Sequence, residues 1–158
     1  MKLPKPLKII AIVIGCEMVG ILGSYFTFSS IPTWYAYLNK PFFNPPNWIF
    51  GPVWTLLYAM MGFAAFVIWE KAKNKTVRKK AMRLFGFQLF LNGIWTPIFF
   101  GLKNLLFALL VIIALWVLIL LTIEEFHKIE KKAAYLLVPY LLWVTFATLL
   151  NLAILILN

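Results

Sequence analysis

The stretch NLLFALLVIIALWVLILLTI, residues 104–123, contains no Asp, Glu, Lys or Arg. A helix needs about 20 apolar residues to cross the hydrocarbon of a bilayer, at ~1.5 Å rise per residue, and this stretch is long enough. A helix in a soluble protein would show a polar face at a period of 3.6 residues, and this stretch shows none. The stretch therefore predicts a membrane-spanning helix.

Four further stretches of the chain have the same character. Residues 41–69, 84–102 and 133–158 are free of charge, and the stretch from Leu7 to Phe28 is interrupted only by Lys8 and Glu17. Apolar residues make up 63% of the 158 residues and charged residues 13%, against roughly half and a quarter in soluble domains. We predict one all-α integral membrane domain over residues 1–158, with spans at about 7–28, 48–70, 81–101, 104–125 and 133–157.

The basic residues are concentrated in alternate connections. Of the 15 Lys and Arg, 13 lie before or at the start of span one, between spans two and three, or between spans four and five, which leaves Lys40 and Lys103. The positive-inside rule then predicts the N-terminus inside and the C-terminus outside. The net charge of +10 is thus explained by topology, helped by anionic lipid, and we expect no nucleic-acid partner.

The longest connection, roughly residues 29–47, joins spans one and two on the predicted outer side. It is rich in proline and aromatic residues, which make a chain stiff rather than flexible. Two interpretations remain open: an ordered lid over the bundle, or an aromatic belt at the membrane surface. The candidate lid residues are Trp34, Pro41, Pro45, Pro46 and Trp48.

Polar and aromatic side chains of spans two, three and five fall at similar depths in the outer half when the rise is counted along each helix. Within each span they share a helix face through i, i+3 or i+4 spacing. They could form a pocket for a flat, mostly apolar ligand, or fill gaps and bridge helices, and these residues alone favour packing. The residues are Trp54, Tyr58, Asn92, Trp95, Trp143, Ala147 and Asn151.

Span one carries two further features. Cys16, Gly20 and Ser24 form a ladder of small residues suited to close helix approach, within the bundle or between subunits. Glu17 at mid-span is a candidate for a functional acid such as a proton relay, or a neutral carboxyl bonded to another helix, and we favour the second. Otherwise spans one and four are expected to serve as scaffold.

Several motifs resemble the TspO/MBR family, which comprises the tryptophan-rich sensory proteins and the mitochondrial translocator protein. They follow one another in order over nearly the whole chain: Trp34-Tyr35, Lys40-Pro41, Pro45-Pro46-Asn47-Trp48-Ile49-Phe50-Gly51-Pro52-Val53-Trp54, Leu57-Tyr58, Met61-Gly62, Gln88-Leu89, Asn92, Trp95, Pro97-Ile98-Phe99-Phe100-Gly101, Pro139-Tyr140, Trp143, Phe146-Ala147, Leu150 and Asn151.

The resemblance implies a five-helix bundle, commonly a homodimer, with a ligand cavity closed by the first loop. Family members bind porphyrins, haem-like tetrapyrroles and isoquinoline-type drugs. Trp54 and Trp143 match tryptophans that line the cavity and are implicated in light-dependent porphyrin breakdown, and Tyr58, Asn92 and Ala147 match other pocket positions. The resemblance therefore favours a pocket over packing alone.

We accordingly expect a receptor- or translocator-like protein that binds tetrapyrroles and acts in their handling or in a stress response. The alternatives are a light-dependent porphyrin-degrading enzyme and a transporter of small amphipathic molecules. The chain has one His and one Cys and no metal-ligand spacing, so we expect no conventional enzyme, bound metal or resident cofactor.

One motif of the family's animal members is missing. These proteins end span five with a sterol motif, a tyrosine followed by a basic residue, whereas here Asn151 is followed by Leu152 and further apolar residues. We therefore do not expect sterol binding through that element, and the ending suits a prokaryotic plasma membrane.

Overall fold

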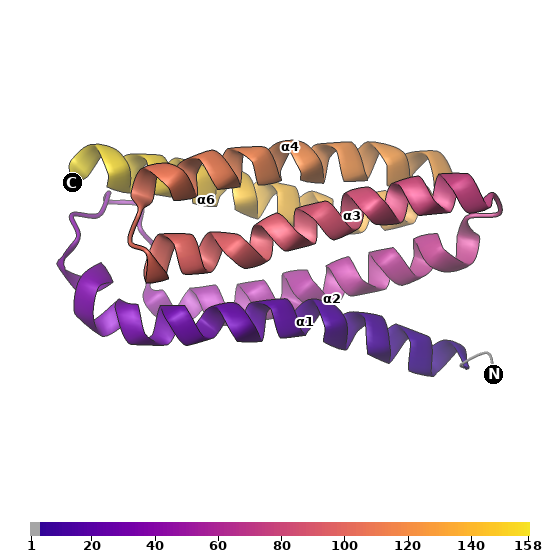
Figure 1. Ribbon diagram of the computed structural model, residues 1–158, viewed down its shortest axis with the longest axis horizontal. Coiled ribbons are helices and arrows are strands. Elements are labelled where there is room, and N and C mark those ends of the chain that lie inside the picture. Colours follow the sequence, from indigo (N-terminus) through magenta and orange to yellow (C-terminus); the bar gives the residue numbers. More distant parts are fainter. Residues whose placement is uncertain (1–3) are drawn as a thin grey trace.

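The computed structural model describes residues 4–158, and within them the chain forms helices that lie side by side along one axis (Figure 1). Five helical segments are long and apolar enough to cross a membrane, which confirms the predicted all-α architecture. In chain order the elements are α1 (Lys5–Ser30), η1 (Ile31–Tyr35), α2 (Asn47–Lys71), α3 (Lys75–Thr96), η2 (Pro97–Gly101), α4 (Leu105–Ile129), α5 (Lys131–Leu136) and α6 (Val138–Leu157).

Most of the helices extend beyond the predicted spans, and side-chain caps rather than the edges of the apolar runs determine where α3 and α4 begin. The side chain of Asn74 accepts hydrogen bonds from the backbone N–H groups of Thr76 and Val77 at 2.8 and 3.3 Å, so α3 begins at Lys75 instead of near residue 81. Asn104 caps α4 in the same way through the N–H of Phe107, at 2.9 Å.

The first helix also runs further than predicted. Pro32 lacks a backbone N–H, and the chain accommodates it in the π-helical segment η1, which continues α1 to Tyr35. Trp34 lies in η1 and Trp48 in the first turn of α2, so these two candidate lid residues belong to helices and not to the connection. The irregular connection shrinks to residues 38–46.

The two ends of the bundle differ in charge and in connections. The N-terminus and the α2–α3 connection lie at one end, and the C-terminus and residues 38–46 lie at the other (Figure 1). At the N-terminal end Lys8 pairs with Glu70 at 2.9 Å, which links α1 to α2, and Lys80 pairs with Glu125 at 2.8 Å, which links α3 to α4. Which end faces the cytoplasm remains a prediction of the positive-inside rule.

α1 changes partner along its length. Near the N-terminal end it lies close to α2, because a Cβ on Gly62 would come within 2.7 Å of the Val13 Cα. Towards the C-terminal end it contacts α3 and η2 instead, where the Ser30 hydroxyl donates to the Phe100 carbonyl at 2.8 Å and Gly101 lies against Phe26. The first helix therefore crosses the bundle surface from α2 to η2.

Candidate ligand cavity

A cavity of about 460 Å³ lies between the helices. It occupies the half of the bundle nearer the C-terminus. Its size is in the range of small-molecule sites, which is roughly 300–1,000 Å³. All five long helical segments contribute to its walls. The cavity-lining aromatic side chains are Phe28, Tyr35, Trp48, Phe50, Trp54, Tyr58, Trp95, Phe99, Phe100 and Trp143.

The structure brings every predicted ligand-binding residue to this one cavity. Trp54 and Tyr58 line it from α2, Asn92 and Trp95 from α3, and Trp143 and Ala147 from α6. The depth count placed them together because rise along straight helices is nearly constant. Their role as ligand contacts remains a prediction.

The expectation that spans one and four are scaffold was wrong. Ile112 and Leu115 of α4 line the cavity, and α1 presents a stripe to it that includes Gly20, Ser24 and Thr27. These side chains are small or purely apolar, so nothing in their chemistry distinguishes them from packing residues. The i, i+4 ladder of small residues was the one feature of span one that could have indicated a close contact. Gly20 makes such a contact inside the bundle, where its Cα lies against the Tyr58 ring.

A chain of hydrogen bonds joins three helices beside the cavity. The Tyr58 hydroxyl donates to Asn92 Oδ1, and Asn92 Nδ2 donates to the Tyr140 hydroxyl at 2.8 Å. The Tyr140 hydroxyl in turn donates to Gln88 Oε1 at 2.9 Å. Tyr58 and Asn92 therefore already satisfy one another, and they present a fixed polar surface to the cavity.

Trp95 is similarly engaged with the protein. Its indole N–H donates to Asn151 Oδ1 at 3.3 Å, and Asn151 Nδ2 donates to the carbonyl of Leu105 at 3.0 Å. The Trp95 ring stacks on Phe99 with centroids 4.9 Å apart. Trp95 can thus offer its ring face to a ligand, while its N–H holds α3 to α6.

Trp143 differs from Trp95 in this respect. Its Nε1 atom is buried and has no hydrogen-bond partner within residues 4–158. The ring lies beside Phe50 and Phe146, with centroid separations of 6.0 and 5.5 Å. Buried N–H groups are rarely left unpaired, so Trp143 has an unused donor beside the cavity, enclosed by its neighbours.

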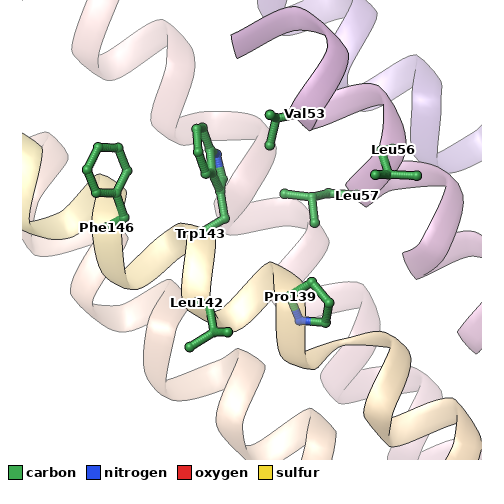
Figure 2. A pocket seen from close by; sticks show the side chains of 7 residues that line it. All are labelled: Val53, Leu56, Leu57, Pro139, Leu142, Trp143 and Phe146. Carbon is green, nitrogen blue, oxygen red and sulfur yellow. The ribbon is translucent and has the colours of Figure 1, made fainter. Parts of the chain in front are cut away.

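Trp143 also separates the cavity from a second hollow. An apolar groove of about 380 Å³ lies between α2 and α6. Figure 2 shows Val53, Leu56 and Leu57 of α2 facing it together with residues of α6 that include Trp143. Trp143 belongs to both linings, so its ring is the partition between groove and cavity.

The connection 38–46 is ordered by bonds to the end of α6. The backbone N–H of Asn39 donates to Asn158 Oδ1 and Asn158 Nδ2 donates to the Asn39 carbonyl, both at 3.0 Å. The Tyr35 hydroxyl donates to Asn44 Oδ1 at 2.8 Å. Pro41, Pro45 and Pro46 lie in or beside this segment and do not line the cavity, and Phe42 is 99% exposed. The segment thus combines a fixed backbone with one fully outward aromatic side chain, Phe42, while Phe43 lies beside Phe146 of α6.

Glu17 lines the cavity from the middle of α1. Within residues 4–158 the structure gives its carboxyl no hydrogen bond, so the favoured expectation of a bond to another helix was wrong. The acid is half-exposed, so it borders both the cavity and the surroundings of the bundle.

Comparison with known proteins identifies the family. A family model described as TspO/MBR family matches residues 12–157. The chain belongs to the TspO/MBR family. The TspO/MBR chain is 47% identical to tryptophan-rich protein TspO of Archaeoglobus fulgidus, over 96% of this chain and 97% of that protein. It is 43% identical to the protein of the same name from Chlorobaculum tepidum, over 98% of each.

The similarity extends to animal members of the family. The human translocator protein is 36% identical over 87% of this chain and 80% of its own length. Family membership and the five long apolar helices make this an integral membrane protein with a translocator- or receptor-like role.

Proposed function

We propose that this TspO/MBR protein binds a porphyrin or a related flat tetrapyrrole in the cavity and acts as a receptor in tetrapyrrole handling or a stress response. The observation that carries the proposal is a cavity of about 460 Å³, within the bundle, to whose walls every long helix but α4 contributes aromatic side chains. A flat π-system is the ligand that such walls favour, because each well-placed aromatic pair contributes roughly 0.5–1.5 kcal/mol beyond the area it buries.

The polar groups support the same ligand class. Several of those that line the cavity bond within the protein, as Tyr58 and Asn92 do, whereas the carboxyl of Glu17 and the N–H of Trp143 have no partner in residues 4–158. The Trp143 N–H is the buried donor without a partner in residues 4–158. A mostly apolar ligand with one or two hydrogen-bond acceptors, such as the carboxylates of a porphyrin, fits these unpaired polar groups.

The test is a titration of the purified protein in nanodiscs with protoporphyrin, followed by the shift of the porphyrin absorption band. We expect saturable binding, and we expect Trp143→Phe to weaken it by about three- to tenfold, because one hydrogen bond is worth about 0.5–1.5 kcal/mol. Trp69→Phe is the matched control, since Trp69 lies on α2 outside the cavity, and it should bind as the unmodified protein does.

The outcomes separate the candidate functions. The absence of saturable binding would remove the proposal. Loss of the bound porphyrin under illumination, faster than that of free porphyrin and slowed by Trp54→Phe or Trp143→Phe, would favour the degrading enzyme. Movement of porphyrin into sealed proteoliposomes would favour the transporter.

A further inference from the structure

The walls of the cavity are unequally exposed. On α3, η2, α4 and α6 every lining side chain is buried or half-buried. On α1 and α2, by contrast, several cavity-lining residues are exposed to the surroundings of the bundle: Ile21 at 58%, Phe28 at 75%, Trp48 at 74%, and Gly51 and Thr55. A residue that lines a cavity and is also exposed lies at its mouth. The exposed members come from two neighbouring helices, so the mouth lies between α1 and α2.

The path of α1 explains this opening. Near the N-terminal end the α1–α2 seam is closed, because Gly62 lies against the backbone of Val13 and Gly20 against the Tyr58 ring. Beyond Gly20, α1 leaves α2 for α3 and η2, as the contacts of Gly23 with Thr96 and of Ser30 with Phe100 show. The seam therefore opens where α1 departs.

The opening lies at membrane depth. Thr55 is about 12 Å along α2 from its first residue, Asn47, at ~1.5 Å per residue. The hydrocarbon core is about 30 Å thick, so an opening that reaches this far down the helix faces acyl chains and not only head groups. On the α1 side of the opening, Ile21 and Phe28 are apolar, which suits contact with acyl chains.

The other two routes are more obstructed. The groove between α2 and α6 is separated from the cavity by the ring of Trp143, which lines both. At the C-terminal end the connection 38–46 is tied to α6 through Asn39 and Asn158.

We propose that the gap lined by Ile21 and Phe28 of α1 and by Trp48, Gly51 and Thr55 of α2 is a side opening through which the ligand passes between the bilayer and the cavity. The inference rests on the proposed function, and it adds the ligand's source. The ligand is a flat amphipathic molecule dissolved in the membrane, which reaches its site without crossing the connection 38–46.

The test introduces bulk at the opening. A Cβ built on Gly51 meets no atom within 4 Å, so the backbone at this position accepts a side chain, and Gly51→Phe adds bulk at the opening. Gly86→Phe is the matched control, because Gly86 of α3 is also exposed, also has free space at its Cβ, and does not line the cavity. A third variant, Asn158→Ala, loosens the connection at the end of the bundle.

Rates of protoporphyrin transfer between vesicles and protein in liposomes are measured for all three variants. We expect Gly51→Phe to slow both association and dissociation, by about fivefold or more, since an obstructed path raises one barrier in both directions. A ring that merely filled the cavity would leave dissociation unchanged or faster. Gly86→Phe and Asn158→Ala should exchange ligand at the rates of the unmodified protein.

Two results would overturn the inference. If Gly51→Phe does not slow dissociation, the path does not run between α1 and α2. If Asn158→Ala instead accelerates both rates, the ligand passes the end of the bundle. Either result leaves equilibrium binding intact and so spares the proposed function. Failure of the unmodified protein to bind protoporphyrin would remove both proposals.

Discussion

Tyr140 illustrates what a single residue contributes to this bundle. It is completely buried, and its hydroxyl accepts from Asn92 and donates to Gln88, so it links α6 to α3 twice. Each interhelical bond in a membrane protein is worth roughly 0.6 to 1.7 kcal/mol. We expect Tyr140→Phe to lower the free energy of unfolding by about 1–3 kcal/mol, because it leaves two buried polar groups without a partner. Denaturant unfolding in mixed micelles, followed by circular dichroism, measures the loss.

Tyr25→Phe is the control for that substitution. Tyr25 is 78% exposed on α1, and its hydroxyl has no hydrogen bond to residues 4–158. Its removal should leave the unfolding midpoint where it was. Equal losses for Tyr25→Phe and Tyr140→Phe would show that the buried chain of hydrogen bonds contributes nothing.

At the scale of an element, the glycines of α1 and α2 determine how closely the two helices approach. A methyl group on Gly62 would meet backbone atoms of Val13, which cannot move aside as a flexible side chain could. We expect Gly62→Ala to force the helices apart and to cost about 1–3 kcal/mol of stability. The same unfolding assay measures this cost.

Gly15→Ala distinguishes packing from helix propensity. Gly15 lies on α1, two residues after Val13, but a Cβ there meets nothing within 4 Å. Alanine favours helix over glycine by about 1 kcal/mol, so this variant should be neutral or slightly more stable. A destabilised Gly15→Ala would contradict the assignment of close approach to Gly62.

At the scale of the whole molecule, the connection 38–46 links the first two helices to the last one. Asn158→Ala removes both of the bonds between the Asn158 side chain and Asn39. We expect the Asn39 amide to exchange with solvent about fivefold faster, because one hydrogen bond is worth about 1 kcal/mol. Hydrogen exchange followed by mass spectrometry measures this change.

In Asn158→Ala the amides of the remaining helices should exchange at the rates of the unmodified protein. Asn74→Ala at the opposite end removes only the cap of α3 and serves as the control. Exchange that rose throughout the helices of Asn158→Ala would show that the connection stabilises the entire bundle and is not a local latch.

The number of spans and the residues of the site could be predicted because both depend on local properties. In hydrocarbon each backbone polar group must bond within its own helix, so an uninterrupted apolar run such as residues 104–123 can hardly be anything else. Constant rise then places Trp54, Trp95 and Asn151 at comparable depth without knowledge of the packing. Their family motifs point to the same positions.

The tertiary structure decided which groups are already occupied and where the cavity opens. Trp95 and Trp143 look alike in the sequence, yet one N–H is bonded to Asn151 and the other has no partner among residues 4–158. Glu17 lines the cavity without a hydrogen bond to that part of the chain, and α1 forms a wall although its small residues suggested only packing. These facts depend on the rotation and tilt of each helix, which contacts distant in the sequence, such as that of Gly62 with Val13, impose. Composition and rise carry no information about either angle.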